Sequence, residues 1–140
     1  MTFRVITTID VDDEGEIPAG FTGRVRRCFD GRESYVAWFV GGRLENPGRT
    51  HPAYRRFRAD GQLKYEMFYE NGRLQDPSDG DAAVRGFFAN GQLHYEEHYR
   101  GGKRWDARDG SAAVSKWRAD GTLRHQLHYR NGERIRGHHG

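Results

Sequence analysis

The chain has 140 residues, and its 23 basic and 20 acidic residues give a net charge of +3. This near balance lacks the concentrated positive charge that is typical of nucleic-acid-binding proteins. No run approaches the 18 or so apolar residues that a transmembrane helix needs, and the N-terminus lacks the basic start and apolar stretch of a signal peptide. The single cysteine, Cys28, is consistent with a reducing compartment, so we expect the protein in the cytoplasm.

The opening segment, residues 3–11, has the composition of a β-strand. Residues 12–23 form a polar stretch that is typical of a loop. We therefore expect residues 1–23 to supply an N-terminal strand and a polar loop. The strand is expected to cap or cover the first of the units that follow.

From residue 24 onward the sequence repeats with a period of 30. Two glycine columns mark the repeat, and the first of them always follows an aspartate or asparagine. The columns are Gly31, Gly61, Gly91 and Gly121, and Gly42, Gly72, Gly102 and Gly132. We predict a single domain over residues 1–140, with the repeats at residues 24–53, 54–83, 84–113 and 114–140, the last of them truncated.

Each repeat is predicted to be a β-hairpin, because Asp-Gly or Asn-Gly between alternating apolar and polar residues is the strongest short hairpin signal. A three-residue loop at 59–61 would place Phe57 opposite Leu63, and equivalent positions are apolar in two further repeats. A two-residue loop would instead place Phe57 opposite Lys64. The expected pairs are Phe57 with Leu63, Phe87 with Leu93, Trp117 with Leu123, and Arg27 with Glu33. The predicted fold class is therefore all-β, an elongated antiparallel meander of about four hairpin repeats plus an N-terminal strand.

Alternation along the central strands predicts one apolar and aromatic face and one charged face. In the second repeat, Lys64, Glu66, Phe68 and Glu70 are expected on the charged face. The apolar face is expected to carry Phe57, Leu63, Tyr65, Met67, Tyr69, Phe87, Leu93, Tyr95, Tyr99, Trp117, Leu123 and Tyr129. A sheet this thin must curl over its apolar face or bury it against another chain.

The sequence therefore predicts a non-enzymatic platform that binds a protein partner, because exposed aromatic and arginine side chains dominate interface hot spots. The expected partner-binding residues are Tyr65, Tyr69, Tyr95, Tyr99, Trp117, Tyr129, Arg56, Arg58, His98 and His128. We assign no catalytic residue, cofactor or metal ligand, since the catalytic triad elbow, the phosphate loop and the dinucleotide fingerprint are all missing from the sequence.

Two alternative functions remain open at this stage. Basic residues on aromatic strands could hold single-stranded nucleic acid, although glutamates interrupt them. These basic residues are Arg56, Arg58, Arg85, Lys116, Arg118, Arg124 and Arg130.

Alternatively, His94, His98 and His128 could converge near Glu96 and bind a metal such as zinc. A homo-oligomer also remains open. The aspartates of residues 76–81 superficially resemble a calcium loop, but the chemistry of tight turns explains them.

The unit aromatic-x-Ala-(Asp/Asn)-Gly-x-Leu-x5-Tyr-x-(Asn/Gly)-Gly, as in residues 57–72, resembles the MORN-repeat variant. That variant occurs in bacterial proteins of the YwqK type, which are described as antitoxin components beside polymorphic toxins. The resemblance extends over roughly residues 28–135, and it implies an elongated sheet of hairpins. It further implies an antitoxin or immunity role with a cognate toxin as partner. The period of 30 is longer than the family's, because an Asp-x-x-Asp-Gly segment is inserted between successive hairpins.

Overall fold

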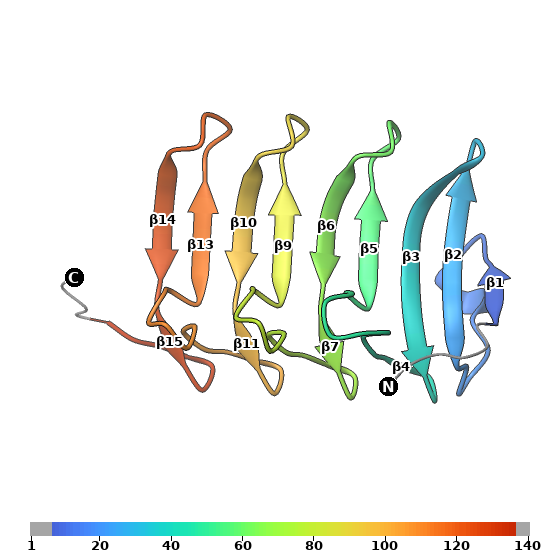
Figure 1. Cartoon of the computed structure of the whole chain (residues 1–140), viewed down its shortest axis with the longest axis horizontal. Coiled ribbons are helices and arrows are strands. Elements are labelled where there is room, and N and C mark those ends of the chain that lie inside the picture. The colour runs from blue at the N-terminus through green and yellow to red at the C-terminus, as the bar shows by residue number, and fades with distance from the viewer. Residues whose placement is uncertain (1–6, 137–140) are drawn as a thin grey trace.

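The computed structural model describes residues 7–136 and contains one long sheet, with short accessory hairpins at one end of its strands (Figure 1). The main sheet has the order β1-β2-β3-β5-β6-β9-β10-β13-β14. Its strands are β1 (Thr8–Asp10), β2 (Gly23–Phe29), β3 (Arg32–Val40), β5 (Tyr54–Phe57), β6 (Leu63–Met67), β9 (Val84–Phe87), β10 (Leu93–Glu97), β13 (Val114–Trp117) and β14 (Leu123–Leu127). The predicted all-β meander of hairpins is confirmed.

Accessory strands extend the lower end of each repeat in Figure 1. Strand β4 (Arg43–Leu44) pairs with β3, whereas the later repeats carry separate two-stranded ribbons. The ribbons are β7 (Tyr69–Glu70) with β8 (Arg73–Leu74), β11 (Tyr99–Arg100) with β12 (Lys103–Arg104), and β15 (Tyr129–Arg130) with β16 (Glu133–Arg134).

The N-terminal strand pairs with β2 in parallel, whereas the other pairs of the described sheet are antiparallel. Only the end of the predicted strand is observed, as β1, because residues 3–6 lie outside the described residues, as do residues 137–140 of the last repeat. A short 3-10 helix, η1 (Glu14–Glu16), follows β1 within the predicted loop.

The predicted turn register is confirmed in three of the four hairpins. Phe57 faces Leu63, Phe87 faces Leu93, and Trp117 faces Leu123. In the second repeat the Gly61 amide donates to the Arg58 carbonyl at 2.8 Å, and Gly61 has a φ of 90°. This is the predicted three-residue loop, a type I turn closed by a left-handed glycine.

The predicted pairing of Arg27 with Glu33 in the first repeat is wrong. Glu33 pairs with Cys28, and Arg27 pairs with Tyr35. The cause is a tighter turn of two residues, in which Asp30 and Gly31 both have positive φ, at 51° and 75°. Aspartate tolerates this left-handed conformation better than most residues, and the resulting geometry is that of a type I′ turn.

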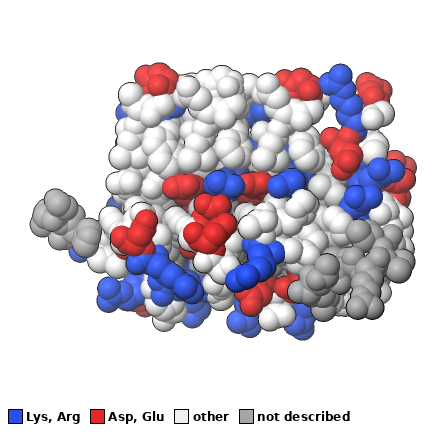
Figure 2. All heavy atoms as spheres, in the orientation of Figure 1, with Lys and Arg blue, Asp and Glu red and all other residues white. Residues whose placement is uncertain are grey.

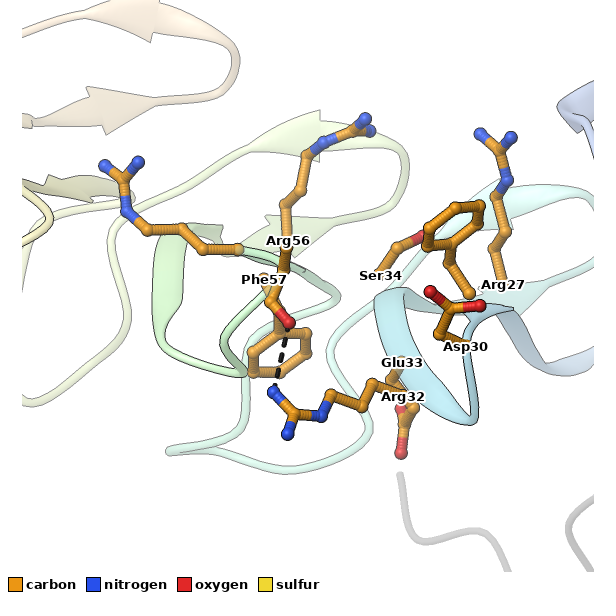
Figure 3. A pocket seen from close by; sticks show the side chains of 10 residues that line it. Arg27, Asp30, Arg32, Glu33, Ser34, Arg56 and Phe57 are labelled. Atoms are coloured by element: carbon orange, nitrogen blue, oxygen red, sulfur yellow. Dashed lines mark hydrogen bonds between the residues drawn. The ribbon is translucent and has the colours of Figure 1, made fainter.

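A bulge near each hairpin tip also corrects the predicted faces. In the second repeat Leu63 pairs with Phe57 while Tyr65 pairs with Arg56, so one residue of β6 is left without a partner. Arg56 and Phe57 point to opposite sides of the strand (Figure 3). Alternation alone predicts that Leu63 and its equivalents share a face with the tyrosines. Because of the bulge, they lie on the opposite face.

We call the side of the main sheet that carries Tyr35, Tyr54, Tyr65 and Tyr95 the tyrosine face, and the opposite side the linker face. A cluster on the tyrosine face comprises Val11, Val25, Tyr35, Ala37 and Tyr54, all buried. Ile17 and Phe21 of the N-terminal segment pack against it. As expected, the N-terminal strand caps the first unit by pairing with β2, whereas the cover by Ile17 and Phe21 comes from the segment that was expected to be a polar loop.

The linker face is buried by the segments that connect the repeats. Residues 46–53, 75–83 and 105–113 end in Ala53, Ala83 and Ala113, whose exposed fractions are all 0%. One aromatic slot of the repeat lies beneath them and holds Trp38, Phe68 and His98, with exposed fractions of 8%, 3% and 5%. The face predicted to be charged therefore carries a charged row and, beneath the linkers, a second core.

Candidate interaction surface

Cross-strand pairing on the tyrosine face creates a row of alternating basic and aromatic residues. Successive partners across eight strands, from β2 to β14, are Arg27, Tyr35, Arg56, Tyr65, Gly86, Tyr95, Lys116 and His125. We call this the central row. It contains no acidic residue, so its positive charge is not neutralised within the row.

A second row on the same face is almost entirely apolar. Its successive partners are Val25, Ala37, Tyr54, Met67, Val84, Glu97, Val114 and Leu127. Glu97 is the exception, and its Oε1 accepts hydrogen bonds from the Tyr99 hydroxyl at 2.7 Å and from Arg104 Nη2 at 3.3 Å. The tyrosine face thus combines apolar area with cationic and hydroxyl groups.

The tyrosines are held in fixed orientations by their neighbours. The Tyr54 ring stacks on Tyr35 and Tyr65, with ring centroids 5.7 Å and 5.9 Å apart. Burial raises the pKa of Tyr54 to about 12, so its hydroxyl stays protonated at neutral pH. Across the next strand, a Cβ on Gly86 would lie 2.2 Å from the Tyr95 ring, which shows that this ring lies directly over the glycine.

The cover over the tyrosine face stops part of the way along the sheet. Tyr35 and Tyr54 are buried under the N-terminal segment, and the packed cluster ends at Tyr65 and Met67. Tyr95 is only half-buried, and β14 is largely exposed. Within residues 7–136, the part of the tyrosine face from β6 to β14 lies beyond the cluster that the N-terminal segment covers, and its side chains are partly exposed apart from Val84 and Val114, which are 8% and 2% exposed. We call this part of the tyrosine face the open face.

On the linker face, ion pairs between neighbouring strands neutralise part of the charge. Glu66 is 4% exposed and accepts hydrogen bonds from Arg85 Nη2 at 2.7 Å and from Arg55 Nε at 3.4 Å. Glu96 follows Arg85 in the same cross-strand row. Figure 2 shows this side of the molecule, where acidic and basic side chains alternate across the strands. Arg85, which was expected in the nucleic-acid surface, is thus committed to an internal ion pair.

Each linker is fixed by one acidic or amide side chain. Asp76 Oδ1 accepts the amides of Ala83 and Tyr99, both at 2.9 Å. Asn46 and Asp106 make the equivalent bonds in the neighbouring linkers. The second oxygen of Asp76 lies 2.7 Å from Nδ1 of His98, and Asp106 pairs with His128 in the same way at 2.8 Å. We call this arrangement the linker pin.

The linker pin accounts for the histidines and aspartates that suggested a metal. His98 and His128 pair with carboxylates, while the His94 ring stacks on Phe88 with centroids 4.0 Å apart. The described residues contain no group of three His, Cys, Asp or Glu side chains that could hold a metal ion. In the calcium-like segment, Asp79 Oδ1 accepts the Asp81 amide, as expected for a turn.

The ten predicted partner-binding residues lie in several parts of the molecule. Arg56, Tyr65 and Tyr95 lie in the central row, and Tyr69, Tyr99 and Tyr129 begin the accessory ribbons. Trp117 lies at a hairpin tip opposite Leu123, and Arg58 Nη2 donates to the Phe87 carbonyl at 2.9 Å. His98 and His128 belong to linker pins, and His98 is buried.

Sequence reasoning missed several residues of the surface. Tyr35 stands thirty residues before Tyr65, so the repeat period could have placed it in the same column. Arg27 was out of reach, because its place in the central row depends on the tighter first turn.

A family model of the MORN repeat variant matches residues 53–74 and 81–100. These segments contain the β5–β6 hairpin with its accessory ribbon, and most of the next repeat. MORN repeats are a non-catalytic type that typically serves in protein interaction. Comparisons with curated proteins and with solved structures gave no match. Over residues 7–136, no helix is long and apolar enough to cross a membrane.

Proposed function

We propose that this chain is a non-enzymatic binding platform that engages a protein partner through the open face. The observation that carries the proposal is the contrast between the two sides of the sheet. The linkers bury part of the linker face, where Glu66 pairs with two arginines, whereas from β6 to β14 most of the central and apolar rows stays partly exposed, apart from Gly86, Val84 and Val114. Uncovered apolar area with aromatic and basic side chains is the usual composition of an interface centre.

The more specific form of the proposal is an immunity role, in which the partner is a cognate toxin and the complex forms in the cytoplasm. The matched MORN-repeat segments and the resemblance to YwqK-type proteins support this form. A platform suits neutralisation, because a partner can be blocked by occupying its surface without any chemical step.

Alanine at Tyr65 and Tyr95 together tests the platform. Affinity capture from the native host's lysate, in nuclease-treated and untreated halves, should recover one protein with the unaltered chain. Tyr65→Ala with Tyr95→Ala should weaken that complex by roughly 2–4 kcal/mol, as for hot-spot aromatics. The control pair Lys64→Ala with Arg124→Ala alters exposed residues outside the central row and should leave capture unchanged.

Nucleic acid is the second candidate function, and the alternation of basic and aromatic residues in the central row favours it over a catalytic role. Recovery that disappears after nuclease treatment, with affinity that falls steeply as salt rises, would contradict the protein-platform proposal. A complex that survives both nuclease and moderate salt would support it.

A further inference from the structure

A cleft of about 530 Å³ opens between the tips of the first two hairpins (Figure 3). Pairing of β3 with β5 ends at Tyr35 and Arg56, and beyond this point the two tips separate. One hydrogen bond spans the gap, from Arg32 Nη1 to the Ala59 carbonyl at 3.1 Å. We call this space the tip cleft.

The tip cleft is positively charged. Four arginines and two carboxylates line it, which leaves a net charge of +2. Among the described residues, neither Arg27 nor Arg56 makes an ion pair with a carboxylate, and Arg56 interacts with the hydroxyls of Tyr54, at 3.4 Å, and Tyr65. The positive charges of these two guanidinium groups are therefore not neutralised by a carboxylate of the described residues.

Polar atoms without partners are also concentrated at this position. Ser34 Oγ and Arg58 Nε are buried without a hydrogen-bond partner, and both residues line the tip cleft. Buried polar atoms of this kind are uncommon and require an explanation such as a missing ligand. Beside them, Phe29 is 69% exposed and offers apolar contact.

The two guanidinium groups of Arg27 and Arg56 face the same side of the sheet. Arg27 and Arg56 lie on either side of Tyr35 in the central row, two strand spacings or about 10 Å apart. Figure 3 shows both side chains extending in the same direction. The tip cleft is thus continuous with the central row.

We propose that the tip cleft binds carboxylate side chains of an acidic segment in the protein partner, with a neighbouring apolar side chain against Phe29. This inference rests on the proposed function and adds the chemistry of the partner. Arginine binds carboxylates through two parallel charge-assisted hydrogen bonds. A nucleic-acid strand fits less well, because Asp30 and Glu33 reduce the net charge of the lining to +2, which balances two carboxylates but not a longer run of phosphates.

The test is an NMR titration of the full chain with the capped tripeptide acetyl-Glu-Phe-Asp-amide. We expect shifts at the side-chain Nε–H groups of Arg27, Arg32 and Arg56. The uncharged analogue acetyl-Gln-Phe-Asn-amide should bind about tenfold more weakly, because it lacks the charge-assisted bonds. Equal binding of the two peptides, or tighter binding of oligothymidylate at the same residues, would overturn the inference.

A matched pair of variants locates the binding. Arg27→Gln with Arg56→Gln should remove the peptide-induced shifts, whereas Arg124→Gln, at an exposed position of β14, should leave them intact. Thermal melting checks that the double variant is folded. Shifts that persist in a folded double variant would contradict binding in the tip cleft.

The captured partner separates this inference from the platform itself. Loss of partner binding with the tyrosine variants, but not with Arg27→Gln and Arg56→Gln, would overturn the tip-cleft inference and leave the platform intact. Weaker partner binding with the arginine pair supports the tip cleft. Tripeptide binding without any captured protein would instead count against the proposed function alone.

Discussion

At the scale of single residues, the linker pin shows how side-chain identities are matched within one repeat. Where the accepting residue is Asn46, the buried ring slot 22 positions later holds Phe68. Where it is Asp76, the slot holds His98, whose ring nitrogen binds the second carboxylate oxygen. A carboxylate in this partly buried position needs a hydrogen-bonding partner for its second oxygen, such as His98. The uncharged amide of Asn46 has no such need, and an apolar ring can occupy the slot beside it.

This matching predicts which substitutions are tolerated. Asp76→Ala should lower the free energy of unfolding by roughly 2–4 kcal/mol, because two backbone amides and His98 lose their partner. Asp76→Asn with His98→Phe copies the first linker and should stay within about 1 kcal/mol of the unaltered chain. Urea unfolding measures both, and equal losses in the two variants would contradict the pin.

The same pair predicts a pH dependence. Burial disfavours the charged His98 ring, but its hydrogen bond to Asp76 and that carboxylate's charge outweigh burial and raise the pKa of His98 above its usual value of about 6.5. A raised pKa in the folded state means that protonation of His98 stabilises the fold. This contribution is full below about pH 6.5 and is lost as pH rises through the folded-state pKa.

Thermal melting between about pH 5 and pH 9 measures this effect. The variant with Asp76→Asn and His98→Phe should lack the part of the decline in melting temperature that His98 causes. An identical pH profile in the variant and the unaltered chain would remove His98 from the explanation.

At the scale of the hairpin, one column of the repeat adopts two conformations. Asp30 has a φ of 51° in its two-residue turn, whereas Asp60 lies outside the positive-φ region in a three-residue loop. Asp30→Gly should therefore stabilise the chain by up to about 1 kcal/mol, because glycine is unstrained at positive φ. Asp60→Gly should destabilise it by about 0.5–1 kcal/mol, because glycine adds entropy to the unfolded chain.

Denaturant unfolding of the two glycine variants provides the comparison. Opposite signs at these two positions support the difference in turn geometry. Changes of the same sign and size would contradict it.

Within each hairpin, the turn register could be predicted only where apolar residues pair across the strands. The loop register of three hairpins follows from apolar pairs such as Phe57 with Leu63. The first register was not predictable, because Asp-Gly is compatible with both loops and the pair of Arg27 with Glu33 looked favourable. The bulge beside Leu63 was not predictable either, since it depends on how the ladder adapts to the turn.

The same limit applies to the candidate surface. Tyr65 and Tyr95 were identified because alternation holds beyond the bulge. His98 was misplaced, because the linker that buries it reads in sequence as a string of turn residues. Nothing in turn chemistry indicates which face of the sheet a connecting segment covers.

At the scale of the whole molecule, the chain is a series of units joined at equivalent positions. Met67 pairs with Val84 at one junction, and Glu97 pairs with Val114 at the next. Residues 82–84 and 112–114 share the sequence Ala-Ala-Val. A repeat array of this kind derives its stability from units and nearest-neighbour interfaces.

Deletion of residues 84–113 should therefore leave a folded protein. Ala83 would then be followed by Val114, and Met67 would pair with Val114. Asp76 would hydrogen-bond to the ring of His128 in place of that of His98. We expect the same β-sheet circular dichroism per residue and a lower melting temperature. Deletion of residues 84–98, half a unit, should prevent cooperative unfolding because it leaves the repeats out of phase.

The whole molecule also has two unlike sides, one covered by the linkers and one partly exposed from β6 to β14. Hydroxyl-radical footprinting of the free chain and of its complex with the captured partner tests this difference most directly. We predict that Tyr65 and Tyr95 react in the free chain and become protected in the complex, while Phe68 stays unreactive in both. Protection confined to the linkers, with Tyr65 and Tyr95 equally reactive in the free and bound chain, would contradict binding through the open face.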